Sequence, residues 1–190
     1  VATDPAWATV HTLRQLNPVA KKTLKELLTT CRMVKSVGVL SEELLELAGA
    51  GAARWTGVAI DFVPNADHLA RFPALEHLDL SNVRSADGSV LPAGLFAGAP
   101  GLTRLDLPWR IGSTPEHLAA VPGLKHLVLR QPLPSDTALH PLKALERLEL
   151  QFVPTPEQLA GLKLRELFCP VPAPAQLEAI LAAVLTLRVF

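Results

Sequence analysis

The hexapeptide Leu75-Glu76-His77-Leu78-Asp79-Leu80 has the spacing L-x-x-L-x-L, and that spacing recurs along most of the 190-residue chain. Seven other segments fit it with apolar replacements, and successive segments start 19 to 27 residues apart. Such a recurrence predicts one module used many times rather than several unrelated domains. The eight segments are 34–39, 55–60, 75–80, 102–107, 124–129, 145–150, 164–169 and 184–189.

The spacing resembles that of the leucine-rich repeat family, whose repeats of roughly 20–29 residues each supply a short strand and a helix or 3-10 turn. The resemblance covers residues 34–190, which make about eight repeats. It implies an α/β, right-handed solenoid shaped as a horseshoe or arc, with a parallel β-sheet on the concave face and short helices or 3-10 turns on the convex face. The side chains at positions one, four and six should point into the core. The spacers are long enough for the crossovers that parallel strands require.

Position nine departs from the family pattern. The family commonly places Asn there, where its side chain bonds neighbouring backbone, but this chain has other residues. Valine followed by proline, as in 153–154 and 171–172, should bury an apolar group and stiffen the turn. We therefore interpret the chain as a divergent, short-repeat, bacterial-type member that lacks the Asn ladder. The residues at position nine are Val63, Val83, Arg110, Pro132 and Val153.

Several spacers carry the signals of helix N-termini. Thr114 and Thr155 are each followed by Pro and Glu, which favours a capped helix with Pro in its first turn. Ser41 precedes two glutamates in a similar way, and Thr155 with Gln158 has capping-box spacing. The spacers are therefore predicted to contain short helices.

The two ends of the chain are expected to differ from the repeats. Residues 1–33 are predicted to form an N-terminal helical end piece, with a helix over about residues 18–32. The segment 7–10 echoes 55–58, which also suggests a degenerate first repeat. At the other end the motif predicts a strand that stops at Phe190 and leaves an open edge.

Side chains at positions three, five and seven should form rows across the outward face of the sheet, because neighbouring strands lie about 4.8 Å apart. Charged residues of the middle repeats then share one surface, the central patch. Arg and Trp are enriched at binding hot spots, so this patch favours contact with a protein partner. The alternative is a solvated face on which acids and bases neutralise one another, at about 0–1 kcal/mol for each exposed pair. The predicted partner-binding residues are His77, Asp79, Arg104, Asp106, Trp109, His126, Arg130, Arg147 and Glu149.

A second predicted surface lies near the C-terminal end. Phe168, Pro170 and Phe190 should expose an apolar strip on the concave face. Exposed apolar patches mark either a contact site or the place where an array continues. The open edge at Val184–Phe190 adds possible self-association to these alternatives.

Catalytic chemistry is weakly indicated. Asp79 and Asp106 should lie about 5 Å apart on neighbouring strands, which leaves a metal-dependent hydrolase as a remote alternative. Arg104 is an unfavourable neighbour for a bound cation, and an open sheet excludes water poorly. The sequence has no nucleotide-binding or nucleophile-elbow motif. We therefore expect no enzyme activity, no catalytic or metal-binding residues and no cofactor.

The spacer histidines and the cysteines are expected to have structural roles. His68 and His117 each precede an apolar Leu, as Gln158 does, and should be surface residues. Cys169 replaces the leucine of position six and should be buried. Cys31 should lie about 28 Å from Cys169, which excludes a disulfide between them.

The composition narrows the class of partner. Lys plus Arg and Asp plus Glu each number 18, so the formal net charge is zero and neither nucleic acid nor a membrane is favoured. No sufficiently long apolar stretch and no N-glycosylation sequon occur, which favours a reduced, cytoplasmic location. The sequence therefore predicts a protein–protein interaction module that binds through the concave face. The alternative is a structural or assembly fragment of a longer repeat protein, joined through its C-terminal strand edge.

Overall fold

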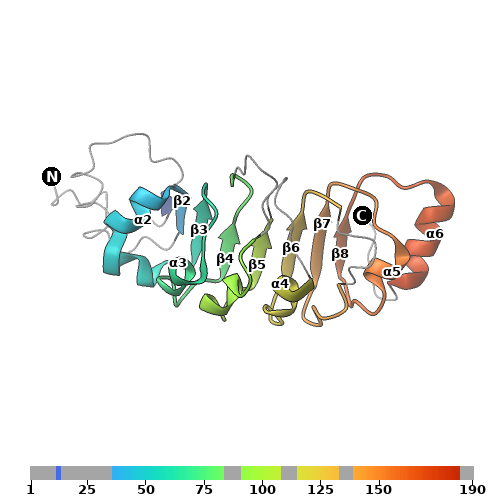
Figure 1. Ribbon diagram of the computed structural model, residues 1–190. Coiled ribbons are helices and arrows are strands. Elements are labelled where there is room, and N and C mark those ends of the chain that lie inside the picture. Colours follow the sequence, from blue (N-terminus) through green and yellow to red (C-terminus); the bar gives the residue numbers. More distant parts are fainter. Residues whose placement is uncertain (1–11, 14–35, 84–90, 108–114, 133–138, 185–190) are drawn as a thin grey trace.

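A computed structural model describes residues 12–13, 36–83, 91–107, 115–132 and 139–184. Within these ranges eight parallel strands form one sheet, and each of them pairs with the next strand along the chain. The strands stand side by side along an elongated molecule (Figure 1). They are β1 (Thr12–Leu13), β2 (Ser36–Leu40), β3 (Gly57–Ile60), β4 (His77–Asp79), β5 (Arg104–Asp106), β6 (His126–Leu129), β7 (Arg147–Leu150) and β8 (Glu166–Phe168).

The strands pair at equivalent positions of the motif. Position three of one strand lies opposite position three of the next, as His77 lies opposite Arg104. The backbone just before each strand is equally regular, because Glu76 O accepts hydrogen bonds of 2.8 Å from both Thr103 N and Arg104 N. Thr56 O and Lys125 O accept from their next repeats in the same way. The predicted parallel sheet is therefore confirmed, and its register sets equivalent side chains in rows.

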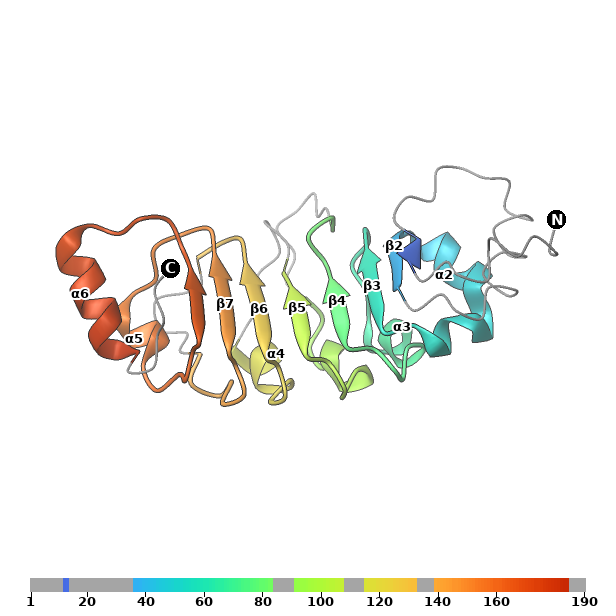
Figure 2. The same ribbon diagram turned by 180° about the vertical axis from the view of Figure 1, so that it is seen from behind.

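Short helices connect the strands on one side of the sheet. Helix α4 lies in front of β6 in Figure 1 and behind it in Figure 2, which shows the opposite, open face. Helix η3 approaches α3 so closely that a Cβ at Gly98 would lie 2.5 Å from Ala66 O, which explains the glycine. The helices are α2 (Glu42–Ala48), η2 (Gly49–Arg54), α3 (Ala66–Ala70), η3 (Leu95–Gly98), α4 (Pro115–Ala119), α5 (Pro156–Leu159) and α6 (Pro174–Ala183).

Side-chain caps begin several of these helices. Thr155 and Gln158 form the predicted capping box of α5, in which Thr155 N donates to Gln158 Oε1 at 3.1 Å. Ser41 Oγ accepts from Leu44 N at the start of α2. Asn65 and His68 form an equivalent box at α3. The spacer patterns did not indicate this last cap.

The expectation that the spacer histidines are surface residues is wrong for His117 and is met only in part for His68, whose side chain is 14% exposed. His117 is only 5% exposed, and its Nε2 lies at hydrogen-bond distance, 2.9 Å, from Pro92 O. Gln158, at the equivalent position, is also buried. His117 packs against the preceding repeat, where its ring lies edge-on to Phe96, whereas Gln158 turns back to accept from the backbone of its own cap, Thr155. These side chains therefore hold the helix starts against the repeats.

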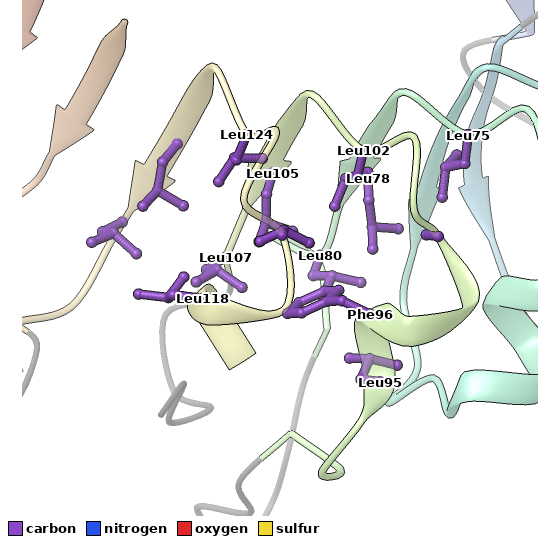
Figure 3. Packing of buried hydrophobic residues seen from close by; sticks show 14 of the residues in the cluster. Leu75, Leu78, Leu80, Leu95, Phe96, Leu102, Leu105, Leu107, Leu118 and Leu124 are labelled. Carbon is purple, nitrogen blue, oxygen red and sulfur yellow. The ribbon is translucent and has the colours of Figure 1, made fainter. Parts of the chain in front are cut away.

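Leucines at positions one, four and six build the core, as predicted. All three are buried in each of the four middle repeats. Figure 3 shows that Leu78, Leu80 and Leu105 come from the sheet side and meet Phe96 and Leu118 from the helical side. Burying one such side chain contributes about 1.5–3 kcal/mol. The repeats are thus held together by one continuous apolar layer between sheet and helices.

The core pattern weakens toward the C-terminal end. Cys169 is only partly buried, so its predicted burial is met in part, and that burial raises the pKa of its thiol. Val63 and Val153, each followed by Pro, are partly buried and pack on the core as expected. Val171, by contrast, is 95% exposed, so the prediction for that Val-Pro pair is wrong. The chain leaves the sheet there and leads to α6, so no strand and helix enclose this valine.

For the ends and loops, the structure bears on one expectation, the register of β1, and leaves the others as predictions. In β1, Thr12 pairs with Ser36, so position three falls on Thr12 rather than on Thr9 as the echo of residues 55–58 predicts. The predicted helix over 18–32 and the strand ending at Phe190 lie outside the described residues, as do Arg110 and Cys31. The division at residue 33, the right-handed crossovers and the horseshoe curvature stay predictions. None of the helices in the described ranges has the length and apolar character needed to cross a membrane.

Candidate interaction face

The open face of the sheet presents two rows of side chains from β4 to β8. Seven of the nine residues of the predicted central patch lie in these rows. Of the other two, Arg130 stands at position seven of its repeat, just after β6, and Trp109 lies outside the described residues. Row three contains His77, Arg104, His126, Arg147 and Glu166. Row five contains Asp79, Asp106, Val128, Glu149 and Phe168.

The first unit of this face joins His77 of β4 to Arg104 and Asp106 of β5. Arg104 Nη2 donates to Asp106 Oδ2 at 3.2 Å, and His77 Nε2 lies 3.4 Å from the same oxygen. The Asp106 side chain is only 8% exposed. Burial alone would raise the pKa of Asp106, but the bonds from His77 and Arg104 outweigh it and hold the pKa below its ordinary value. Asp106 is therefore a buried carboxylate that stays charged at neutral pH.

The second unit has the same design two strands further along. Arg147 Nε donates to Glu149 Oε1 at 2.9 Å, and His126 Nε2 lies 2.9 Å from that oxygen. Arg147 Nη1 also donates to Glu166 Oε2 on β8 at 2.8 Å. The Glu149 side chain is 32% exposed. Burial raises its pKa, but the bonds from Arg147 and His126 outweigh burial and lower it.

His126 is best described as a neutral ring. Burial lowers the pKa of His126 first, and the guanidinium of Arg104 lowers it further, while Glu149 acts in the opposite sense. The short distance to Glu149 would also suit a charged pair. The lowered pKa instead favours a neutral imidazole, whose Nε2–H donates to Glu149. The second unit is therefore held together by a hydrogen bond from His126 to Glu149 and by the ion pairs of Arg147 with Glu149 and Glu166.

An aromatic ring adjoins the second unit. The guanidinium carbon of Arg147 lies 4.6 Å from the centre of the Phe168 ring, which is a cation–π contact. Phe168 is 43% exposed on the open face, as the sequence predicts. Phe190, the other residue of the predicted apolar contact, lies outside the described residues. The other large exposed hydrophobic residues of the described chain are Val171, Leu177 and Leu181.

Asp79 and Asp106 lie opposite each other, as predicted for the remote metal-site alternative. Asp79 Oδ1 accepts from Ser81 N at 2.8 Å, while Asp106 is bonded to Arg104 and His77. Across the described ranges, no three His, Cys, Asp or Glu side chains are grouped so that they could hold a metal ion. The rows offer paired charges and one aromatic ring for contact with another molecule.

The repeat spacing identifies the face but does not show how its residues pair. The two units repeat because His and Arg alternate at position three of four successive repeats, and each Arg is followed two residues later by an acid. That alternation is visible in H-L-D-L, R-L-D-L, H-L-V-L and R-L-E-L. Glu166 was also missed as a partner of Arg147, although the same row contains both.

Comparisons with known proteins show the fold but no family. No protein-family profile and no curated protein matches the chain. The fold is similar to that of TLR13, a leucine-rich-repeat protein, in the crystal structure of the TLR13–ssRNA13 complex, with a TM-score of 0.65 and 16% sequence identity. The similarity covers 95% of this chain and 28% of that chain. The chain thus has a leucine-rich-repeat-like α/β fold and spans less than a third of the protein that it resembles.

Proposed function

We propose that the open face of the sheet binds a protein partner, with Arg104, Arg147 and Phe168 as the main contact residues. The observation that carries this proposal is the exposure of Phe168, a large aromatic side chain that is 43% exposed. Its ring contacts the guanidinium of Arg147 and lies among the charged side chains of the two rows. Aromatic residues and Arg are enriched at protein interfaces. A leucine-rich-repeat-like fold is compatible with a general interaction role.

The opposing interpretation is a solvated face of mutually neutralised charges. The ion pairs of both units support it in part, because exposed pairs form for only about 0–1 kcal/mol and need no partner. It gives no reason for the exposure of Phe168 on the same face. We therefore favour binding, with the ion pairs fixing the contact side chains in place before the partner arrives.

A protein is favoured over nucleic acid as the partner. TLR13 is in complex with RNA in the crystal structure of similar fold, but the present chain has zero formal net charge. Four carboxylates lie in the two rows, from Asp79, Asp106, Glu149 and Glu166. They would repel a phosphate backbone, whose binding depends on uncompensated Lys and Arg. We accordingly propose a binding role without enzyme activity or cofactor.

The test is affinity capture with a double charge reversal, Arg104→Glu with Arg147→Glu. The matched control is Arg54→Glu with Arg71→Glu, which reverses the same charge away from the two rows, in η2 and just after α3. The row variant should lose a captured protein that wild type and control both retain, with unchanged circular dichroism in all three. Equal capture by the row variant would overturn the proposal.

A second candidate function is self-association at the C-terminal end. It is favoured by the exposure of Leu177 and Leu181, which lie one turn apart on α6, and of nearby Val171. The edge at Val184–Phe190, which first suggested this role, lies largely outside the described residues. Light scattering over a range of concentrations tests it: a rise in mass that Leu177→Lys with Leu181→Lys abolishes supports assembly, and a constant monomer mass contradicts it.

A further inference from the structure

The two arginines of the open face differ in how many acids they contact. Arg147 pairs with Glu149 on its own strand and with Glu166 on the following strand. Arg104 pairs with Asp106 on its own strand and, within the described residues, has no second carboxylate. The strand after β5 presents His126 in row three, where the strand after β7 presents Glu166.

Arg104 is both accessible and incompletely satisfied. Its side chain is 42% exposed, the same fraction as that of Arg147. Its Nε is buried without a hydrogen-bond partner among the described residues, whereas Arg147 Nε donates to Glu149. The buried Nε is not open to a partner, but the exposed part of the guanidinium makes a single ion pair in the described part of the chain, to Asp106, and so has donors left for an anion.

The surface beside Arg104 on β6 is suited to one acidic side chain. His126 and Val128 are the outward residues of that strand, so no acid there competes for Arg104. Arg104 lies near enough to His126 that its positive charge, after burial, lowers the pKa of that ring, while Glu149 acts in the opposite sense. Val128 is only 7% exposed, so at this point of row five the sheet presents neither an acid nor a large side chain.

We infer that the partner of the open face places an Asp or Glu carboxylate over β6, between Arg104 and His126, where it pairs with Arg104 as Glu166 pairs with Arg147. This inference rests on the proposed function, because it names the chemistry by which that face recognises a protein. A single carboxylate over β6 would lie between the acids of β5 and β7 and not on them. A chain of phosphates would meet those acids on both sides.

The test uses short random peptides displayed on phage and selected on the purified wild-type chain. Enriched peptides are synthesised, and their dissociation constants are measured with wild type, Arg104→Gln and the control Arg71→Gln. We expect Asp or Glu to be enriched at one peptide position. Arg104→Gln should weaken binding about tenfold, as for loss of a charge-assisted hydrogen bond, and Arg71→Gln should have no effect.

A double-mutant cycle then tests the contact itself. Replacing the enriched peptide acid by its amide should weaken binding to wild type about tenfold and cause little further loss with Arg104→Gln. A peptide with Lys at that position should bind Arg104→Glu better than it binds wild type. Circular dichroism of each variant confirms that it is folded.

Four results would overturn the inference. Enriched peptides without an acid, or acidic peptides indifferent to Arg104→Gln but sensitive to Phe168→Ala, would overturn it and leave the proposed function in place. Peptides insensitive to changes at Arg104, Arg147 and Phe168 would overturn both. Tight binding of a single-stranded RNA oligomer that Arg104→Gln abolishes would replace the carboxylate by a phosphate.

Discussion

The two His–Arg–acid units of the open face have the same residue types in the same register, yet their environments differ. In the first unit the acid is Asp106, which is buried and bonded to Arg104 and His77. In the second unit the acid is Glu149, which is a third exposed, and Arg147 has Glu166 and Phe168 as further partners. The difference shows that the neighbouring side chains, and not the repeat motif, determine whether a charged group is buried in the structure or accessible to a partner.

The shorter side chain of the first unit explains part of this contrast. Asp106 keeps its carboxylate close to the sheet, where the flanking side chains cover it, while the longer Glu149 reaches further into solvent. Removing the charge of a buried carboxylate costs more than removing that of an exposed one, because water does not reach the buried site to replace the lost bonds. Four substitutions test how far this contrast extends.

The largest effect is expected for Asp106→Asn. It should lower the free energy of unfolding by about 2–4 kcal/mol, because Arg104 and His77 lose a buried charged acceptor. The matched variant Glu149→Gln should cost less than about 1 kcal/mol, since its carboxylate is partly solvated. Urea unfolding at neutral pH measures both. Equal losses would remove the distinction between the two units.

Glu166→Gln should convert the second unit into a copy of the first. It leaves Arg147 with one carboxylate, Glu149, and should cost no more than about 1 kcal/mol because the pair is exposed. The same variant should gain affinity for peptides that carry a second acid, since Arg147 now has free donors. Unfolding and peptide titration together check this, and an unchanged preference for a single acid would contradict it.

Phe168→Ala should have a smaller effect on stability. The ring is partly exposed, so loss of its cation–π contact with Arg147 should cost about 0.5–1 kcal/mol. Leu177→Ala on α6 is a control of similar exposure outside the two rows. Partner capture should fall with Phe168→Ala alone. A large loss of stability would mean that the ring serves packing rather than contact.

His126→Gln should alter only the pH dependence of stability. The pKa of folded His126 lies below the value of 6.5 for an ordinary histidine. As the pH falls through about 6.5, the unfolded chain therefore takes up a proton that the folded chain does not, and stability decreases. Thermal unfolding between about pH 5.5 and 7.5 should show a shallower slope for His126→Gln than for wild type. Identical slopes would contradict the lowered pKa.

The repeat made the sheet predictable from the sequence alone. Leu75, Leu78 and Leu80 mark one strand, and the same marks recur at each later strand to β8, so strand positions, core residues and register all follow from spacing. The rows of the open face follow from that register. Spacing is therefore sufficient to assign His77 and Asp79 to the same surface as Arg104.

Features outside the motif could not be predicted in this way. Burial of His117 depends on its contacts with Pro92 and Phe96 of the preceding repeat, and exposure of Val171 depends on the path from β8 to α6. The contacts of Arg147 with both Glu149 and Glu166 depend on the rotamers of these long side chains. Spacing gives no information on any of these, because the first two depend on residues outside the repeated positions and the third depends on side-chain conformation.

The pairing of each strand with the next at equivalent positions also bears on how such a surface changes in evolution. Loss or duplication of a single repeat would move every later strand by one place along the sheet, about 4.8 Å. No side chain would turn to the other face. Loss of the repeat that contains β6 would bring Arg147 beside Arg104 and remove His126 between them. Whole-repeat insertions and deletions can therefore rewrite the order of charges on this surface while the core that supports it stays intact.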